Sequence, residues 1–351
     1  MKRRLLLQSG LSLWSAAWCG TAAWAGPSGS TIAAHFGKLP PPQRVRRVFA
    51  AGAPAGVLLA ALAPEKLVGW PLQLSNTARG LLGAPLHSLP FVGRLAGRGS
   101  TVPLETLVQL QPDLILDSGT ADATYISAAQ RVTEQTGLPC VLVQGRLADH
   151  AAQLREVGQL LGVAERGERL AVYADAALAL AAQLRASVPL GERPRVYFGR
   201  SADGMETGLD GSINLEVLDC VAGHNVAAAA GKGSLTRVSM EQILGWDPQV
   251  IVTQEPEFAR RALSDPLWRS LTAVRKRRVY CAPVLPFGWL DGPPGVNRLI
   301  GVHWLAQLLH PTHPAVRALE PLAVAVQRFY RLFYGAELSP QALTALLGEI
   351  K

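Results

Sequence analysis

The side chains best suited to binding chemistry are guanidinium groups and aromatic rings that follow short aliphatic runs. A guanidinium group meets a carboxylate or catecholate with two hydrogen bonds at once, and the candidates are Arg94, Arg98 and Arg200. Rings that could wall a groove for a flat or bulky ligand are Trp70, Phe287 and Trp289, with Tyr125 as a further contact. The alternative for each tryptophan is a lid over a hydrophobic core. This set predicts a binding site for a bulky anion.

Further candidates follow from the rule that ligands of open α/β sheets bind beyond the carboxyl ends of the strands. The rule adds Pro54 and Ser118, which lie in loops after two predicted strands. Arg298 lies in the first turn of a predicted helix and could point to the cleft or to solvent. The N–H groups at that helix start could also bind an anion, so a small oxyanion remains open as the ligand.

Catalytic and metal-site motifs are absent from the sequence. The segment Gly199 to Asp203 has Asp where the G-x-S-x-G motif needs its last glycine, and there is no phosphate loop, H-E-x-x-H or dinucleotide fingerprint. The seven histidines are dispersed, whereas a bare metal ion asks for three or four convergent ligands. We expect a binding protein without catalytic activity, metal site or resident cofactor, and an exported enzyme is a distant alternative.

The first residues predict export. Lys2-Arg3-Arg4 precedes an apolar run, Leu5 to Trp18, and Ala23-Trp24-Ala25 offers a small-x-small site for signal peptidase. We therefore expect a signal peptide over residues 1–25, of the Sec or twin-arginine type, with cleavage after Ala25 and a mature protein in the periplasm.

Charge and cysteine usage add two expectations. The formal net charge of +8 comes from scattered residues, and the single basic run, residues 275–278, is typical of a solvated turn, so we expect no nucleic-acid partner. The mature chain would keep Cys140, Cys220 and Cys281. An oxidising compartment permits one disulfide, and Cys220 with Cys281 is the favoured pair.

A segment that occurs twice predicts how these residues are positioned. Residues 104–116 (LETLVQLQPDLIL) and 240–252 (MEQILGWDPQVIV) each read as a short helix, a proline and a buried strand, and Glu105 and Glu241 lie 136 residues apart. One such unit in each half predicts two similar lobes with parallel sheets. Further strands are expected at 47–50, 67–70, 140–143, 195–198 and 279–282.

The helical stretch between the halves predicts a rigid connection. Residues 165–188 are rich in Ala and Leu and would form a helix about 36 Å long. We expect an α/β fold of two Rossmann-like lobes with parallel sheets joined by a long rigid interlobe α-helix. The boundaries are 26–147 for the N-terminal lobe, 148–188 for the helical connection and 189–351 for the C-terminal lobe.

In these features the chain resembles the helical-backbone class of ABC-importer binding proteins, which carry ferric siderophores, haem, vitamin B12 and, in a few members, molybdate or tungstate. The resemblance rests on the twin units, the interlobe helix, and the segments Glu206 to Val226 and Pro286 to Leu305. It implies a monomer that captures a metal chelate, with a ferric siderophore first, haem or cobalamin next, and an oxyanion as the alternative. It also implies that Glu105 and Glu241 dock onto arginines of the membrane permease, and it adds Glu206 to the candidate ligand contacts.

Overall fold

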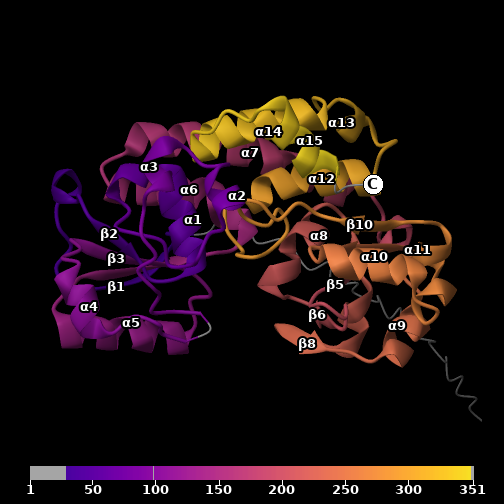
Figure 1. Cartoon of the computed structure of the whole chain (residues 1–351), viewed down its shortest axis with the longest axis horizontal. Coiled ribbons are helices and arrows are strands. Elements are labelled where there is room, and N and C mark those ends of the chain that lie inside the picture. The colour runs from indigo at the N-terminus through magenta and orange to yellow at the C-terminus, as the bar shows by residue number, and fades with distance from the viewer. Residues whose placement is uncertain (1–28, 98, 349–351) are drawn as a thin grey trace, which may run out of the picture.

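The computed structural model describes residues 29–97 and 99–348, and it has two α/β lobes joined along one side by helices (Figure 1). The signal peptide, its cleavage after Ala25 and the candidate Arg98 lie outside the described residues.

The first lobe is built on a four-stranded sheet in the order β1-β4-β3-β2. The strands are β1 (Ile32–Phe36), β2 (Val48–Ala50), β3 (Leu114–Gly119) and β4 (Cys140–Gln144). Its helices are α1 (Ala53–Leu62), α2 (Asn76–Arg79), α3 (Ala84–His87), α4 (Leu104–Gln109) and α5 (Ala123–Thr136). Val48 and Leu116 belong to the same core cluster as α1, whereas Phe49 and Ile115 belong to a cluster with Ala129 of α5. Alternate strand residues point to opposite faces, so helices cover both faces of this sheet.

The second lobe repeats the plan with a fully parallel sheet in the order β10-β9-β5-β7. Its strands are β5 (Arg195–Gly199), β7 (His224–Asn225), β9 (Val250–Thr253) and β10 (Val279–Cys281). A small antiparallel ribbon is formed by β6 (Glu206–Gly208) and β8 (Leu235–Arg237). The helices are α8 (Glu216–Cys220), α9 (Met240–Trp246), α10 (Pro256–Ser264) and α11 (Thr272–Arg275). The predicted fold class is thus confirmed.

The predicted repeat is present in both lobes. Helix α4 leads into β3 and helix α9 leads into β9, each through a short turn. Leu107 and Ile243 occupy equivalent positions in the two helices, and both are fully buried. One buried side chain therefore fixes the rotation of each short helix against its lobe.

Two strand predictions differ from the structure. Residues 67–70 form only isolated bridges, Val48 with Leu67 and Trp70 with Phe91, because the segment changes its partner from β2 to the loop at Phe91. Strand β1, which the sequence analysis did not predict, pairs antiparallel with β4 at the edge of the first sheet.

Helices along one side of the molecule hold the lobes together. Helix α6 (His150–Leu160) and the 24-residue α7 (Ala164–Ser187) connect the two sheets. Helices α12 (Arg298–Leu309), α13 (Pro314–Arg317), α14 (Leu322–Phe329) and α15 (Pro340–Gly348) follow the second sheet. The π-helical turn Tyr330–Tyr334 packs against α1, and the Tyr334 carbonyl accepts a hydrogen bond from the Gly83 N–H at 2.8 Å. The C-terminal helices therefore contact the first lobe as well as the second (Figure 1).

The disulfide suggested between Cys220 and Cys281 is absent, because Cys220 is free and buried, as is Cys140. Cys220 ends α8, which packs against α7 and α12, whereas Cys281 ends the edge strand β10. Among the described helices, none is long and apolar enough to cross a membrane.

Because Cys140 and Cys220 are free, we expect a reductant to leave the stability of the mature protein unchanged. We expect the melting temperature with and without dithiothreitol to agree within about 1 °C, since no cross-link constrains the unfolded chain. Differential scanning calorimetry measures both values. A reductant-dependent fall of several degrees would contradict the assignment.

Candidate ligand-binding cleft

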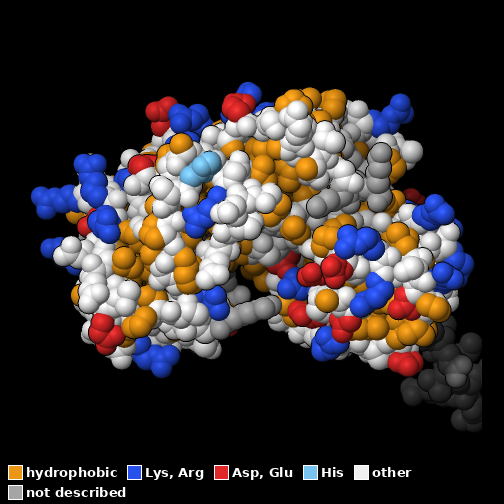
Figure 2. Space-filling view, in the orientation of Figure 1, with side chains coloured by type: hydrophobic (Ala, Val, Ile, Leu, Met, Phe, Trp, Pro, Cys, Tyr) orange, Lys and Arg blue, Asp and Glu red, His pale blue; other side chains and the backbone are white. Residues whose placement is uncertain are grey.

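A cleft with a volume of about 590 Å³ lies between the lobes. Figure 2 shows it as the hollow between the two halves of the molecule. Loops at the carboxyl ends of β2, β3 and β5 line it, together with the loop after β10. The lining residues with the most to offer a ligand are Gly52, Pro54, Arg94, Asp117, Ser118, Tyr125, Arg200, Asn214 and Asp291.

Five of the predicted ligand contacts lie together at this cleft, namely Pro54, Arg94, Ser118, Tyr125 and Arg200. Glu206 is set back from it and forms an ion pair with Arg200, with 3.4 Å between Oε1 and Nε. The rule of strand carboxyl ends therefore selected residues of both lobes that line the same cleft.

Two groups in the first-lobe wall of the cleft could attract an anion, the N-terminus of α1 and the guanidinium group of Arg94. Gly52 and Pro54 lie at the N-terminus of α1, which no side chain caps, so the first N–H groups of this helix have no partner within it. The half-buried Arg94 donates from Nε to the Gly99 carbonyl at 3.2 Å. It forms no ion pair with a carboxylate of the described chain. A helix N-terminus beside a guanidinium group suits an anion.

Asp117 is a cleft residue that the sequence analysis missed, although it directly precedes the predicted Ser118. Its side chain is 7% exposed, and Oδ1 accepts a hydrogen bond from the Ser118 N–H at 2.9 Å. Burial raises the pKa of Asp117 to about 6, against a smaller lowering by the Ser118 N–H. The first-lobe wall therefore contains a carboxyl group that changes charge close to neutral pH.

The second-lobe wall presents a guanidinium group that is already neutralised. Arg200 forms an ion pair with the buried Asp291, whose Oδ1 also accepts from Asn214 Nδ2 at 2.9 Å. With Glu206 on its other side, Arg200 is held in place between two carboxylates. Its charge is less available to a ligand than that of Arg94.

The three rings expected as aromatic walls do not reach the cleft. Trp70, Phe287 and Trp289 are each 0–1% exposed. The Trp70 and Phe287 rings lie 5.8 Å apart between centroids, and Trp289 Nε1 donates to the Tyr330 hydroxyl at 3.3 Å. These rings fill the core between the first lobe and the C-terminal helices, so the lid alternative holds. Of the cleft-lining residues in the described chain, Tyr125 alone is aromatic.

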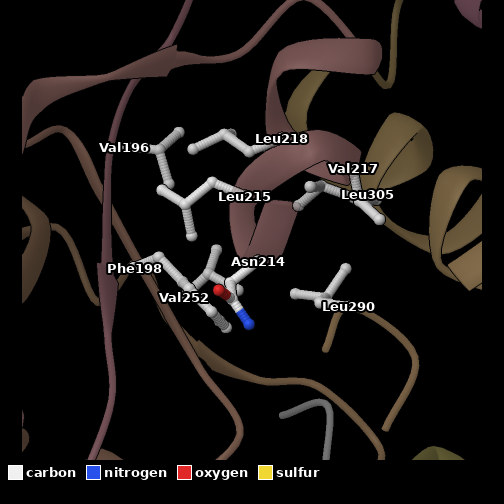
Figure 3. A pocket seen from close by; sticks show the side chains of 9 residues that line it. All are labelled: Val196, Phe198, Asn214, Leu215, Val217, Leu218, Val252, Leu290 and Leu305. Carbon is white, nitrogen blue, oxygen red and sulfur yellow. The ribbon is translucent and has the colours of Figure 1, made fainter. Parts of the chain in front are cut away.

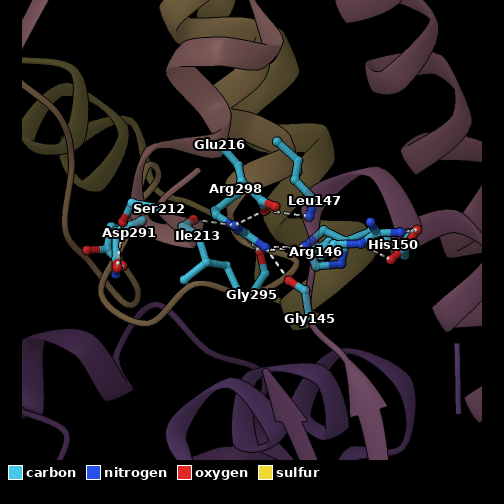
Figure 4. Close-up of polar contacts among 12 residues, drawn as sticks. Gly145, Arg146, Leu147, His150, Ser212, Ile213, Glu216, Asp291, Gly295 and Arg298 are labelled. Carbon is cyan, nitrogen blue, oxygen red and sulfur yellow. Dashed lines mark hydrogen bonds and ion pairs between the residues drawn. The ribbon is translucent and has the colours of Figure 1, made fainter. Parts of the chain in front are cut away.

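Arg298 does not line the cleft either, and it is instead fully buried where the lobes meet (Figure 4). Its guanidinium group has five N–H donors, and five acceptors surround it. They are the carbonyls of Gly145, Ile213 and Gly295, the Glu216 carboxylate at 2.8 Å and His150 Nε2 at 3.3 Å. Glu216 Oε2 also accepts from the Leu147 N–H at 2.7 Å. We call Arg298, Glu216 and His150, with the backbone groups they bind, the interlobe polar cluster.

A chain of hydrogen bonds connects this cluster to the cleft. Gln153 Nε2 donates to the Gln144 carbonyl and to Ser118 Oγ, so its Oε1 must accept from His150 Nδ1. Burial, and then the Arg298 charge, lower the pKa of His150 to about 3. With its proton on Nδ1, the neutral ring presents Nε2 to Arg298 Nη2 at 3.3 Å, and the Gly295 carbonyl oxygen lies 3.0 Å from the same nitrogen. Ser118 at the cleft is therefore fixed by the same network that joins the lobes.

A second hollow lies inside the second lobe beneath α8 (Figure 3). Its lining is apolar except for Asn214, and its volume is about 10 Å³. That is too small to hold more than one water, so it is a gap in core packing. No group of His, Cys, Asp and Glu in the described ranges could hold a metal ion.

Comparison with known proteins agrees with this geometry. Residues 75–284, more than half of the chain, match the periplasmic binding protein family. The chain belongs to that family.

Individual relatives cover nearly the whole chain. An ABC transporter solute-binding protein from Sulfurospirillum deleyianum superposes with a TM-score of 0.78 at 28% identity, covering 88% of this chain and 95% of its own. The molybdate-binding protein MolA of Haemophilus influenzae is 25% identical over 79% of this chain and 82% of its own length. Its molybdate-bound structure gives a TM-score of 0.68 over 86% and 96% of the two chains. The haem-binding protein RhuT of Roseiflexus shares the fold, at 20% identity and a TM-score of 0.58 over 76% and 98%.

We expect the protein to lose much of its stability when Arg298, the cation of the interlobe polar cluster, is replaced. Arg298→Met leaves the Glu216 carboxylate and three carbonyls without their partner, and we expect the free energy of unfolding to fall by about 3–5 kcal/mol. Urea denaturation of the mature protein measures it. The matched control, Arg331→Met, breaks the exposed pair with Glu337 and should leave stability unchanged. A loss equal to that of the control would show that the cluster does not join the lobes.

Proposed function

We propose that this protein is the periplasmic component of an ABC importer and captures an oxyanion of the molybdate and tungstate class in the interlobe cleft. The observation that carries the proposal is the first-lobe wall, where the uncapped N-terminus of α1 and the unpaired Arg94 lie together. Both groups bind anions through N–H donors. The three tryptophan and phenylalanine rings that a flat organic ligand would need are buried.

The relatives support the same ligand class. MolA, a molybdate-binding protein, aligns with most of this chain at 25% identity. Transport without catalysis also agrees with the family, whose described relatives are binding proteins.

A metal chelate is the second candidate, and the cleft volume favours it. A cleft of about 590 Å³ is in the range that organic ligands occupy, whereas a four-oxygen anion fills only a part of it. A ferric siderophore with carboxylate or catecholate groups could bind Arg94, with Tyr125 against its apolar surface. Haem and cobalamin fit the cleft less well, because it lacks a broad aromatic wall.

Delivery to the permease would use the two equivalent glutamates. Glu105 and Glu241 are exposed in the first turns of α4 and α9, one on each lobe and both toward the lower edge of Figure 1. Neither forms an ion pair with the described residues. Two carboxylates on a rigid body can set both position and orientation on a cationic partner. The N-terminal 25 residues would direct export to the periplasm.

A ligand panel tests the proposal on the mature protein, residues 26–351. We expect molybdate and tungstate to raise the melting temperature and to bind in calorimetry, while ferric siderophores, haem and cobalamin do not. Arg94→Ala should weaken oxyanion binding about 10- to 100-fold through the lost charged hydrogen bonds. Arg131→Ala, an exposed arginine on α5, is the control and should bind normally. Stabilisation by a siderophore alone would keep the importer role and replace the ligand.

Asp117 predicts a pH dependence with a definite sign. Its pKa of about 6 leaves it negatively charged at pH 7.5, where it repels an anionic ligand, and mostly protonated at pH 5. Affinity should therefore rise as the pH falls from 7.5 to 5. Asp117→Asn should bind roughly tenfold more tightly at pH 7.5 and lose this pH dependence. Equal affinities of the two proteins at pH 7.5 would place the ligand away from Asp117.

A further inference from the structure

The two helices that carry the exposed glutamates also carry exposed aliphatic side chains at equivalent positions. Val108 of α4 is 46% exposed and Leu244 of α9 is 39% exposed. They lie 136 residues apart, the same separation as Glu105 and Glu241. The repeat thus preserves a pair of side chains, one acidic and one aliphatic, on each lobe.

The local structure makes both pairs face outward. Leu107 and Ile243 are fully buried and fix the rotation of their helices against the lobes. Residues three apart share a face of a helix, so Glu105 and Val108 point to the same side, as do Glu241 and Leu244. Together each pair forms what we call a lobe-end patch.

These patches differ from the remaining exposed apolar side chains. The other large apolar side chains that are exposed do not repeat between the lobes beside a carboxylate. They are Phe91, Val172, Leu190, Leu263, Leu267 and Val324. Single exposed apolar residues need no explanation. A matched pair at equivalent positions in two lobes indicates a partner that offers the same complementary surface twice.

We propose that Val108 and Leu244 are hydrophobic anchors for the membrane permease, which the two lobe-end patches contact through two equivalent subunits. The inference rests on the proposed importer function. Each permease subunit would offer a cationic group to the glutamate and a shallow apolar pocket to the aliphatic side chain. A second copy of this chain is a poor occupant, because pairing patches would bring carboxylates against carboxylates.

The two components of each patch have different roles. The exposed carboxylates act at long range and set the association rate and its salt dependence. The aliphatic side chains lose water only on contact, so they slow dissociation. The importer would thus combine fast capture of the loaded protein with enough residence time for ligand transfer.

Binding kinetics on the importer's own permease, reconstituted in lipid nanodiscs, separate these roles. The anchor variant is Val108→Ser with Leu244→Ser in the otherwise intact mature protein, and the carboxylate variant is Glu105→Gln with Glu241→Gln. The matched control is Leu190→Ser with Val324→Ser, which removes one exposed Leu and one exposed Val elsewhere. Melting temperature and ligand affinity are measured for each variant to show that fold and cleft are intact.

We expect the anchor variant to dissociate roughly tenfold faster with an unchanged association rate, and the control to match wild type. The carboxylate variant should associate more slowly and lose most of its salt dependence. If the carboxylate variant associates more slowly while the anchor variant dissociates at the wild-type rate, the anchor role is wrong and the docking role of the glutamates stands. Wild-type kinetics for both variants would overturn the anchors and the docking glutamates together, whereas no binding by the wild-type protein would overturn the importer function as well.

Discussion

The buried guanidinium group of Arg298 is the interaction on which the arrangement of the lobes depends. A charge taken out of water is costly unless it is paired and hydrogen-bonded, and all five N–H donors of Arg298 have acceptors. Those acceptors come from the end of β4, from α6, from the start of α8 with the turn before it, and from the loop before α12. No single element could satisfy this cation, so the four must converge. Their convergence places the carboxyl ends of both sheets around one cleft.

The interlobe polar cluster also explains why the cleft is preformed. Helix α7 spans the lobes without a break, and the C-terminal helices pack over both. The chain from Arg298 through His150 and Gln153 ends on Ser118, and Asn214 and Asp291 hold Arg200. A site held in this way spends little binding energy on ordering its own side chains. Large closure of the lobes would break the cluster, which favours a ligand that fits the cleft with small local movements.

Patterns of local origin were predicted well from the sequence. The twin helix–strand units and the interlobe helix follow from hydrophobic periodicity, and α7 spans 164–187 where residues 165–188 were expected. The strand-end rule placed Pro54, Arg94, Ser118, Tyr125 and Arg200 at one cleft. Both results depend only on residues that are close to one another in the sequence.

The predictions that failed concern residues whose surroundings come from segments far away in the sequence. A tryptophan after a strand can face a ligand or the core, and Trp70 and Trp289 are buried because Tyr330 and Tyr334, far along the chain, pack in the same region. Four of the five acceptors of Arg298 lie between 82 and 153 residues away, a separation that no local pattern reveals. Asp117 and Asp291 could have been named as candidate site residues, since both lie in segments already singled out. Their burial and their pairing with other groups could not have been predicted from the sequence.

The most direct test of the central claim is anomalous diffraction from crystals of the mature protein grown with tungstate. Tungsten scatters anomalously at its absorption edge, so the ion is located without interpretation of shape. We expect one dominant peak in the cleft, within hydrogen-bonding reach of Arg94 and the N-terminus of α1. A cleft without a tungsten peak, in crystals that instead retain an iron peak from an added ferric siderophore, would contradict the oxyanion assignment and show that the protein carries a chelate.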